Sequence, residues 1–260
     1  QGRVAIYRWN GSAWTQLGSN ITGEARDNYS GYSLSLSSDG SRVAIGAYGN
    51  GGNGANSGHV RIYDYNGSAW VQVGADIDGE AESDNSGYSL SLSSDGSRVA
   101  IGAIGNDGNG SASGHVRIYD YNGSAWVQVG ADIDGEAAGD KSGRAVSLSS
   151  DGTRVAIGAE ENNGANGSNS GHVRIYDYNG SAWVQVGADI DGEAAGDKSG
   201  SSVSLSSDGS RVVIGAPNND AGMTANNIYD YGHVRIYDYN GSAWVQVGAD
   251  IDGEGAGDAS

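Results

Sequence analysis

Short runs of alternating polar and apolar residues, each interrupted by a turn signal, recur along the whole chain. The clearest run extends from Gly58 to Trp70 and reads Gly-His-Val-Arg-Ile-Tyr-Asp-Tyr-Asn-Gly-Ser-Ala-Trp. Copies of it begin at Gly2 (diverged), Gly114, Gly171 and Gly232. Alternation with period two is typical of half-buried β-strands, and no segment has the period of an amphipathic helix. The pattern therefore predicts an all-β repeat protein.

Within this run, Asn66-Gly67 separates two alternating stretches, which is the strongest short-range signal for a β-hairpin. A two-residue turn there would place Tyr65 opposite Ser68 and Tyr63 opposite Trp70. We therefore expect an aromatic cross-strand pair on one face of this hairpin, with aliphatic pairs on the other face.

A second repeated element extends from Ser37 to Ala47 and contains Asp39-Gly40, another hairpin signal. Its copies begin at Ser93, Ser149 and Ser206. The turn predicts that Leu36 pairs with Val43 and that Leu34 pairs with Ile45. The opposite face carries only Ser, Ala and Gly, so this hairpin needs little room on that side.

One small-faced hairpin followed by one aromatic hairpin gives four strands per repeat, and the repeat length is typical of β-propeller blades. Blades are wedges around an axis, so the small-faced hairpin suits the inner strands. We predict a single all-β propeller domain over residues 1–260, with four-stranded antiparallel blades at about 30–78, 86–134, 142–191 and 199–252. An extra outer hairpin at 2–22 precedes them. A β-helix has shorter repeats, and immunoglobulin-like units need about 100 residues each.

Composition restricts the function. The chain carries 32 acidic and 14 basic residues, a formal net charge of −18. Such a field repels phosphate backbones and argues against nucleic-acid binding. No apolar run is long enough for a membrane span, so we expect no membrane insertion. The absence of cysteine excludes disulfides.

The inner hairpin also resembles a known family. The run from Ser199 to Leu205, followed by Asp208-Gly209 and by Val213 to Pro217, resembles the FG-GAP repeat of integrin-α-type propellers. This resemblance extends over all repeats and implies a blade of a secreted or cell-surface protein. The family's Phe is replaced by Ser, however, and its acidic calcium loop shrinks to the turn around Asp39. The family's calcium site therefore does not carry over.

Acidic segments join one repeat to the next and are the best candidates for a cation site. Each offers carboxylates at relative positions 1, 3, 5 and 9 with a glycine between, a set of oxygen ligands that suits Ca²⁺. The candidates are Asp76, Asp78, Glu80 and Asp84; Asp132, Asp134, Glu136 and Asp140; and Asp189, Asp191, Glu193 and Asp197. The alternative is a solvated connection whose charges maintain solubility.

Other recurrent side chains have structural explanations. One histidine per repeat begins a strand, and we interpret these residues as structural: His59, His115, His172 and His233. The Tyr and Trp side chains of the outer hairpins suit core packing better than sugar stacking. Asn-Gly-Ser and Asn-Ile-Thr sequences are glycosylation signals in a secretory context, and the candidates are Asn10, Asn20, Asn66, Asn122, Asn179 and Asn240.

No catalytic arrangement emerges beyond residues that the repeat explains. We therefore expect a non-enzymatic structural or adhesive module, secreted or at the cell surface, whose partner is a protein or a glycan. The alternative is a multivalent carbohydrate-binding lectin with equivalent sites between blades.

The first outer hairpin has no inner hairpin before it, so the repeats do not close a ring within this chain. An open edge invites pairing with another chain. We expect either that the chain is a segment of a longer protein or that it self-associates through the incomplete blade.

Overall fold

The computed structural model describes residues 1–220 and 231–254, and these residues contain strands but no helix. Four similar antiparallel sheets follow one another along the chain. In the first, β5 (Ser33–Leu36), β6 (Arg42–Ala47), β7 (His59–Tyr65) and β8 (Trp70–Gln72) are hydrogen-bonded in that order, and the short β9 (Ile77–Asp78) pairs with β7 beyond the end of β8. The predicted all-β, propeller-like fold is confirmed.

The other three sheets repeat this order. The second contains β10 (Ser86–Leu92), β11 (Arg98–Ala103), β12 (His115–Tyr121), β13 (Trp126–Gln128) and β14 (Ile133–Asp134). The third contains β15 (Ala145–Leu148), β16 (Arg154–Ala159), β17 (His172–Tyr178), β18 (Trp183–Gln185) and β19 (Ile190–Asp191). The fourth contains β20 (Ser202–Leu205), β21 (Arg211–Ala216), β22 (His233–Tyr239), β23 (Trp244–Gln246) and β24 (Ile251–Asp252).

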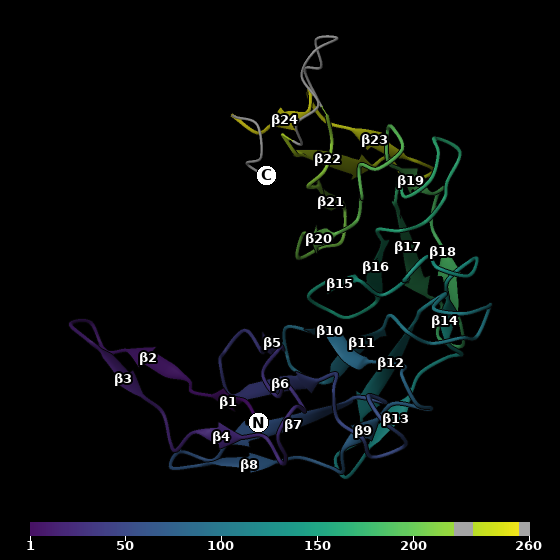
Figure 1. Cartoon of the computed structure of the whole chain (residues 1–260). Coiled ribbons are helices and arrows are strands. Elements are labelled where there is room, and N and C mark those ends of the chain that lie inside the picture. Colours follow the sequence, from purple (N-terminus) through teal and green to yellow (C-terminus); the bar gives the residue numbers. More distant parts are fainter. Residues whose placement is uncertain (221–230, 255–260) are drawn as a thin grey trace.

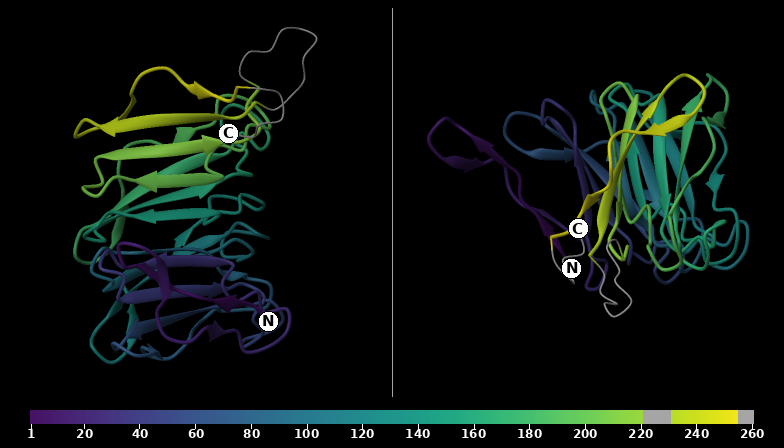
Figure 2. Two further views of the ribbon diagram at one scale, coloured as in Figure 1. Left: turned by 90° about the vertical axis from the view of Figure 1, so that its left-hand side faces the viewer. Right: turned by 90° about the horizontal axis from the view of Figure 1, so that it is seen from above.

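The sheets are arranged in an open arc, with the first strand of each on the inside and the fourth on the outside (Figure 1). The small-faced hairpin is therefore the inner one, as predicted. At the start of the chain, β1 (Arg3–Val4) pairs with β4 (Ile21–Thr22), and β2 (Tyr7–Trp9) pairs with β3 (Trp14–Gln16). Figure 2 shows this purple hairpin projecting at one end of the arc, with the green and yellow strands of the fourth sheet at the other.

The two predicted hairpin registers have different outcomes. In the inner hairpin, Leu36 pairs with Val43 and Leu34 pairs with Ile45, as the Asp-Gly turn predicts. In the outer hairpin, Trp70 pairs with Tyr65 rather than with Tyr63. The loop has four residues because the Asn66 Oδ1 accepts hydrogen bonds from the backbone N–H groups of both Ser68 and Ala69.

The hydrophobic core lies between successive sheets. At the first junction, Leu90 and Leu92 of β10 pack against Ala44, Val60 and Ile62 of the preceding sheet. The aromatic side chains of the outer hairpin close the same junction, because the Trp126 Nε1 donates a hydrogen bond to the carbonyl of Val73 at 2.9 Å. The expected core packing of the outer aromatic residues holds for Trp70, Trp126, Trp183 and Trp244, whereas Trp9 and Trp14 of the first hairpin are exposed.

A repeated arginine also ties neighbouring sheets together. Arg42 donates two hydrogen bonds to the carboxylate of Asp64 within its own sheet, at 2.6 and 2.7 Å. Its Nη1 donates to the carbonyl of Gly96 in the next sheet, and its guanidinium lies 4.9 Å from the ring centre of Tyr121. Each such arginine therefore combines a bidentate ion pair with a cation–π contact across the junction.

Both ends of the arc expose the surfaces that the junctions bury. Leu34 and Leu36 are 52% and 49% exposed, whereas Leu90 and Leu92 at the same repeat positions are 8% and 7% exposed. At the other end, Ile251 is 55% exposed and its counterpart Ile77 only 6%. The repeat interface is therefore complete inside the chain. At the N-terminal end only its outer half is made, where Val4, Ile6 and Ile21 of the first hairpin pack against the first sheet.

This difference yields a test with an internal control. Leu92→Ala removes a side chain from a packed junction and should lower the free energy of unfolding by about 2–4 kcal/mol. Leu36→Ala makes the same change at the open end and should cost less than about 1 kcal/mol. Urea denaturation followed by tryptophan fluorescence measures both. Equal losses would show that the junction does not stabilise the fold as described.

Candidate functional site

A histidine and two carboxylates converge in the cleft between each sheet and the segment that precedes it. The Glu comes from the preceding connection, the His begins the third strand, and the Asp follows the fourth strand. The four clusters are Glu24, His59 and Asp76; Glu80, His115 and Asp132; Glu136, His172 and Asp189; and Glu193, His233 and Asp250. In each cluster one donor atom per residue lies within 4.8 Å of the other two.

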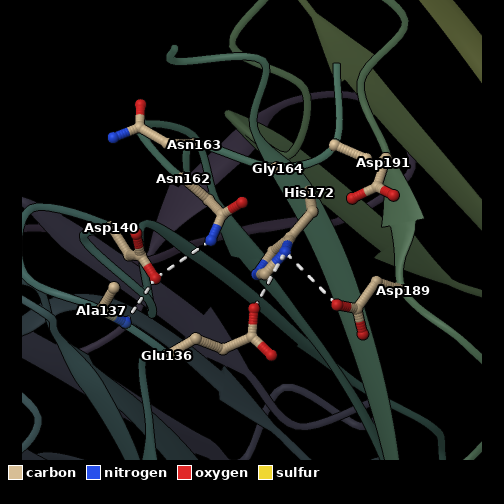
Figure 3. A pocket seen from close by; sticks show the side chains of 10 residues that line it. Glu136, Ala137, Asp140, Asn162, Asn163, Gly164, His172, Asp189 and Asp191 are labelled. Carbon is tan, nitrogen blue, oxygen red and sulfur yellow. Dashed lines mark hydrogen bonds and ion pairs between the residues drawn. The ribbon is translucent and has the colours of Figure 1, made fainter. Parts of the chain in front are cut away.

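The third cluster illustrates the geometry (Figure 3). The His172 Nδ1 lies 3.8 Å from the Glu136 Oε2 and 3.7 Å from the Asp189 Oδ2. These distances exceed those of a hydrogen bond. The three atoms therefore surround a small space without being bonded to one another.

A break in the outermost strand places the Asp. After β18, the N–H of Val186 bonds the carbonyl of Ile175, and Gly187 then adopts a φ of 76°, a conformation that favours glycine. Pairing resumes at Ile190 in β19. The residue between, Asp189, receives a 2.6 Å hydrogen bond on its Oδ1 from the Gln185 Nε2, so its Oδ2 faces His172.

A buried arginine positions the Glu. The Arg174 Nη1 lies 3.7 Å from the Glu136 Oε1, and its Nη2 donates a 2.6 Å hydrogen bond to the carbonyl of Asp134. One Glu136 oxygen thus faces arginine and the other faces histidine. The turn after Glu136 is held by Asp140, whose Oδ2 accepts hydrogen bonds from the Ala137 N–H at 2.9 Å and from the Asn162 Nδ2 at 3.0 Å.

The histidines are buried although they face charged groups. Burial lowers the pKa of His59, His115 and His172, so their imidazoles are neutral at neutral pH. Within the described part of the chain, neither ring nitrogen of His115 or of His233 has a hydrogen-bond partner. A buried polar group without a partner is costly, so this arrangement requires an explanation.

The third cluster opens into a cavity of about 550 Å³. It is lined by Glu136, Asp140, His172, Asp189 and Asp191, together with the loop over residues 162–165. Figure 3 shows these side chains converging from the connection before the sheet, from β17 and from the segment after β18. The cleft is polar and acidic, and it can admit a small molecule.

The structure distributes the predicted calcium ligands differently from the sequence. Asp76, Asp132 and Asp189 face the histidine of their own sheet, whereas Glu80, Glu136 and Glu193 face the histidine of the next sheet. The Asp134 Oδ1 lies 4.0 Å from the His115 Nδ1, and Asp191 lines the cavity of the third cluster. Asp78, in β9, is paired through its backbone with His59 of β7. Asp84, Asp140 and Asp197 are buried and accept hydrogen bonds from their own turns. One acidic run thus contributes to two clefts, and calcium binding stays a prediction.

Sequence reasoning missed the histidines and two acidic residues, Glu24 and Asp250. The signal was present, because the Asp follows each His at the same distance along the chain. The histidines were assigned a structural role because they are far apart along the sequence and around the arc. That argument overlooked the carboxylates that each sheet junction brings to every histidine.

The six candidate glycosylation residues are all exposed. The five Asn-Gly-Ser residues also form their turns through the side-chain Oδ1, as Asn66 does. The Asn20 Oδ1 instead accepts a hydrogen bond from Gln16, in the place that Asp76 takes with Gln72. Glycosylation stays a prediction. Within residues 1–220 and 231–254, no helix is long and apolar enough to cross a membrane.

Comparisons with known proteins establish a shared fold. No family model and no curated protein match the sequence. Among solved structures, a "putative 6-phosphogluconolactonase" from Bacteroides uniformis matches with a TM-score of 0.64 at 10% identity, over 97% of this chain and 66% of that one. A second protein so described, from Bacteroides fragilis, matches with a TM-score of 0.62 at 11% identity, over 98% and 66%. The chain thus spans slightly less than two thirds of these neighbours.

These comparisons correct the FG-GAP resemblance, because no family model matches and the two solved structures above, which share the fold, are described as putative 6-phosphogluconolactonases. The letters that carried the resemblance, Asp-Gly followed by Gly-Ala, are those that a tight inner hairpin with a small face requires. They therefore reflect turn and packing constraints.

The prediction of a non-enzymatic structural or adhesive module, with a lectin as its alternative, is likewise wrong, because the neighbours are described as enzymes. That prediction rested on finding no catalytic arrangement beyond residues that the repeat explains. Here the repeat itself brings a His, a Glu and an Asp together at each junction.

Proposed function

We propose that this chain is part of a propeller hydrolase that opens a cyclic ester, with the reaction in the clefts between sheets. The observation that carries the proposal is the third cleft, where His172, Glu136 and Asp189 surround a space that is open to a cavity of about 550 Å³. The two solved structures of the same fold that are described as putative 6-phosphogluconolactonases support the reaction class.

The chemistry requires a water molecule whose oxygen attacks the ester carbonyl. The new C–O bond forms as one water proton is removed, and the ring C–O bond then breaks. The proton goes to the ring oxygen, so the product is an open-chain hydroxy acid. Acceptors spaced as in the cleft can hold the attacking water, and neighbouring carboxylates can carry protons from it.

The negative charge of the cleft determines which cyclic esters can bind there. The cleft contains Asp140 and Asp191 besides the two carboxylates of the cluster, and the chain has a net charge of −18. Its arginine, Arg174, is buried and already engaged by Glu136 and a backbone carbonyl. A phosphorylated lactone would be repelled. The substrate class that we propose is therefore a neutral sugar lactone.

We also retain the secreted or cell-surface location as a proposal. The exposure of all six glycosylation signals supports it.

The proposal predicts hydrolysis of gluconolactone above the spontaneous rate, with little activity on its 6-phosphate. Replacing Glu24, Glu80, Glu136 and Glu193 together by Gln keeps size and hydrogen-bonding capacity but removes a negative charge from each cleft. The rate above background should fall by about 100-fold or more. A pH-stat assay measures it.

The matched control is the fourfold variant Asp39→Asn, Asp95→Asn, Asp151→Asn and Asp208→Asn. It changes the net charge equally, at turns that lie at the opposite ends of the strands from the histidines. This control should retain full activity. Equal loss in both variants, or wild-type hydrolysis no faster than buffer, would refute the proposed reaction.

A different observation favours a second function, recognition of another polypeptide at the open end. In complete sheets, the third strand pairs with the second, as Val60 does with Gly46. The corresponding strands β1 and β2 pair only with β4 and β3, so their inner edge is unpaired. Beside this edge is an apolar cavity of about 240 Å³, lined by Val4, Ile6, Leu34, Leu36 and Val43 among others. We propose that it accepts an inner hairpin of the same repeat type from a second copy of the chain.

A peptide comprising residues 198–217, the fourth inner hairpin, should bind the chain by strand addition. The double variant Leu34→Glu, Leu36→Glu should abolish binding, and it should reduce any concentration-dependent association in sedimentation. Val184→Glu, at an equally exposed position of the third sheet, is the control and should bind normally. A chain that stays monomeric at high concentration and ignores the peptide would exclude this function.

A further inference from the structure

The four His–Glu–Asp clusters combine two independent signs of a ligand. The first is the donor set itself, one imidazole nitrogen and two carboxylate oxygens within 4.8 Å of one another. The second is the state of the histidines. The side chains of His115 and His233 are 1% and 0% exposed, their Nδ1 atoms face both carboxylates, and these atoms have no hydrogen-bond partner in the described residues.

The spacing suits an ion between the donors. In the third cluster, the Nδ1 of His172 is 3.8 and 3.7 Å from the two carboxylate oxygens. Because the two oxygens are no more than 4.8 Å apart, a point in their plane equidistant from the three atoms is at most about 2.4 Å from each, within the range of bonds to divalent cations. A direct ion pair with a protonated histidine explains these contacts less well, because 3.7 Å is too long for a hydrogen bond and burial favours the neutral ring.

Groups behind the donors fix their orientation, as they do in metal sites. In every cluster a glutamine binds the far oxygen of the Asp at 2.6 Å. An arginine likewise lies 3.5–3.8 Å from the far oxygen of the Glu. Each carboxylate therefore has one oxygen engaged by the protein and one directed at the histidine nitrogen.

We propose that each of the four clefts binds a divalent first-row transition ion, such as Mn²⁺ or Zn²⁺, through His Nδ1 and the two carboxylates. An imidazole ligand favours these ions over Ca²⁺, which takes oxygen ligands only. Three protein ligands leave positions open for water. The ion's role in activating that water rests on the proposed hydrolase function, but its binding does not.

The test is binding of Mn²⁺ to chelator-treated, dialysed protein, measured by loss of the free-ion electron paramagnetic resonance signal and by competition with Zn²⁺. We expect about four sites per chain, one for each cluster. The fourfold Glu→Gln variant at Glu24, Glu80, Glu136 and Glu193 should weaken binding by about 100-fold. The charge-matched variant at Asp39, Asp95, Asp151 and Asp208 should bind as the wild type does.

Circular dichroism of each variant establishes that it is folded. A second fourfold variant should lose binding as the Glu variant does; it combines Asp76→Asn, Asp132→Asn, Asp189→Asn and Asp250→Asn. Absence of Mn²⁺ and Zn²⁺ binding, or binding that the Glu variant retains, would overturn the proposal. So would four-site binding of Ca²⁺ that Zn²⁺ does not displace.

Hydrolysis assays with and without chelator separate the two proposals. Metal binding without lactone hydrolysis would leave the ion site standing and remove the proposed reaction. Hydrolysis that is unchanged by chelator would support the reaction and overturn the ion as its activator.

Discussion

Burial of two aliphatic side chains of each inner strand against the sheet before it is the interaction on which the rest of the structure depends. Leu90 and Leu92 of one inner strand fit against Ala44, Val60 and Ile62 of the sheet before it. A single sheet of this kind has two faces and cannot cover them alone, so each repeat is stabilised by its neighbours. The arc is therefore a series of similar junctions, and Leu34 and Leu36 are exposed because the first hairpin covers only the outer half of the first sheet.

The same contact creates the polar clefts. When this packing brings two sheets together, or the first hairpin and the first sheet, the connection between them carries its Glu to the histidine of the following sheet. That sheet supplies its own Asp through the break in its outer strand. None of the three residues is close to another along the chain, since His172 is 36 residues after Glu136 and 17 before Asp189. The site is therefore a product of repeat stacking, and any change that separates the sheets also separates its donors.

This origin explains which features could be predicted from the sequence. Local rules sufficed for the inner hairpin, where Asp39-Gly40 fixed the pairing of Leu36 with Val43. They failed at the outer hairpin, because the Asn66 side chain accepts hydrogen bonds from two backbone N–H groups and the loop has four residues instead of the predicted two. Local rules could not predict the clusters, because their residues come from segments that are far apart along the chain. Asp76 and Glu80 are neighbours in sequence and were grouped as ligands of one ion, but the strand β9 between them directs them to different histidines.

Electrostatics links the fold to the proposed chemistry. Each cluster gathers two carboxylates around a buried imidazole in a chain that already carries a net charge of −18. The buried arginine compensates only one of these carboxylates, and the glutamine behind the Asp contributes a dipole and no charge. The two carboxylates of each cluster repel one another, and this repulsion opposes their approach at the junction. A divalent cation between the donors would remove this repulsion and give the unpartnered histidine nitrogen a ligand, so the ion site would stabilise the same junctions that form it.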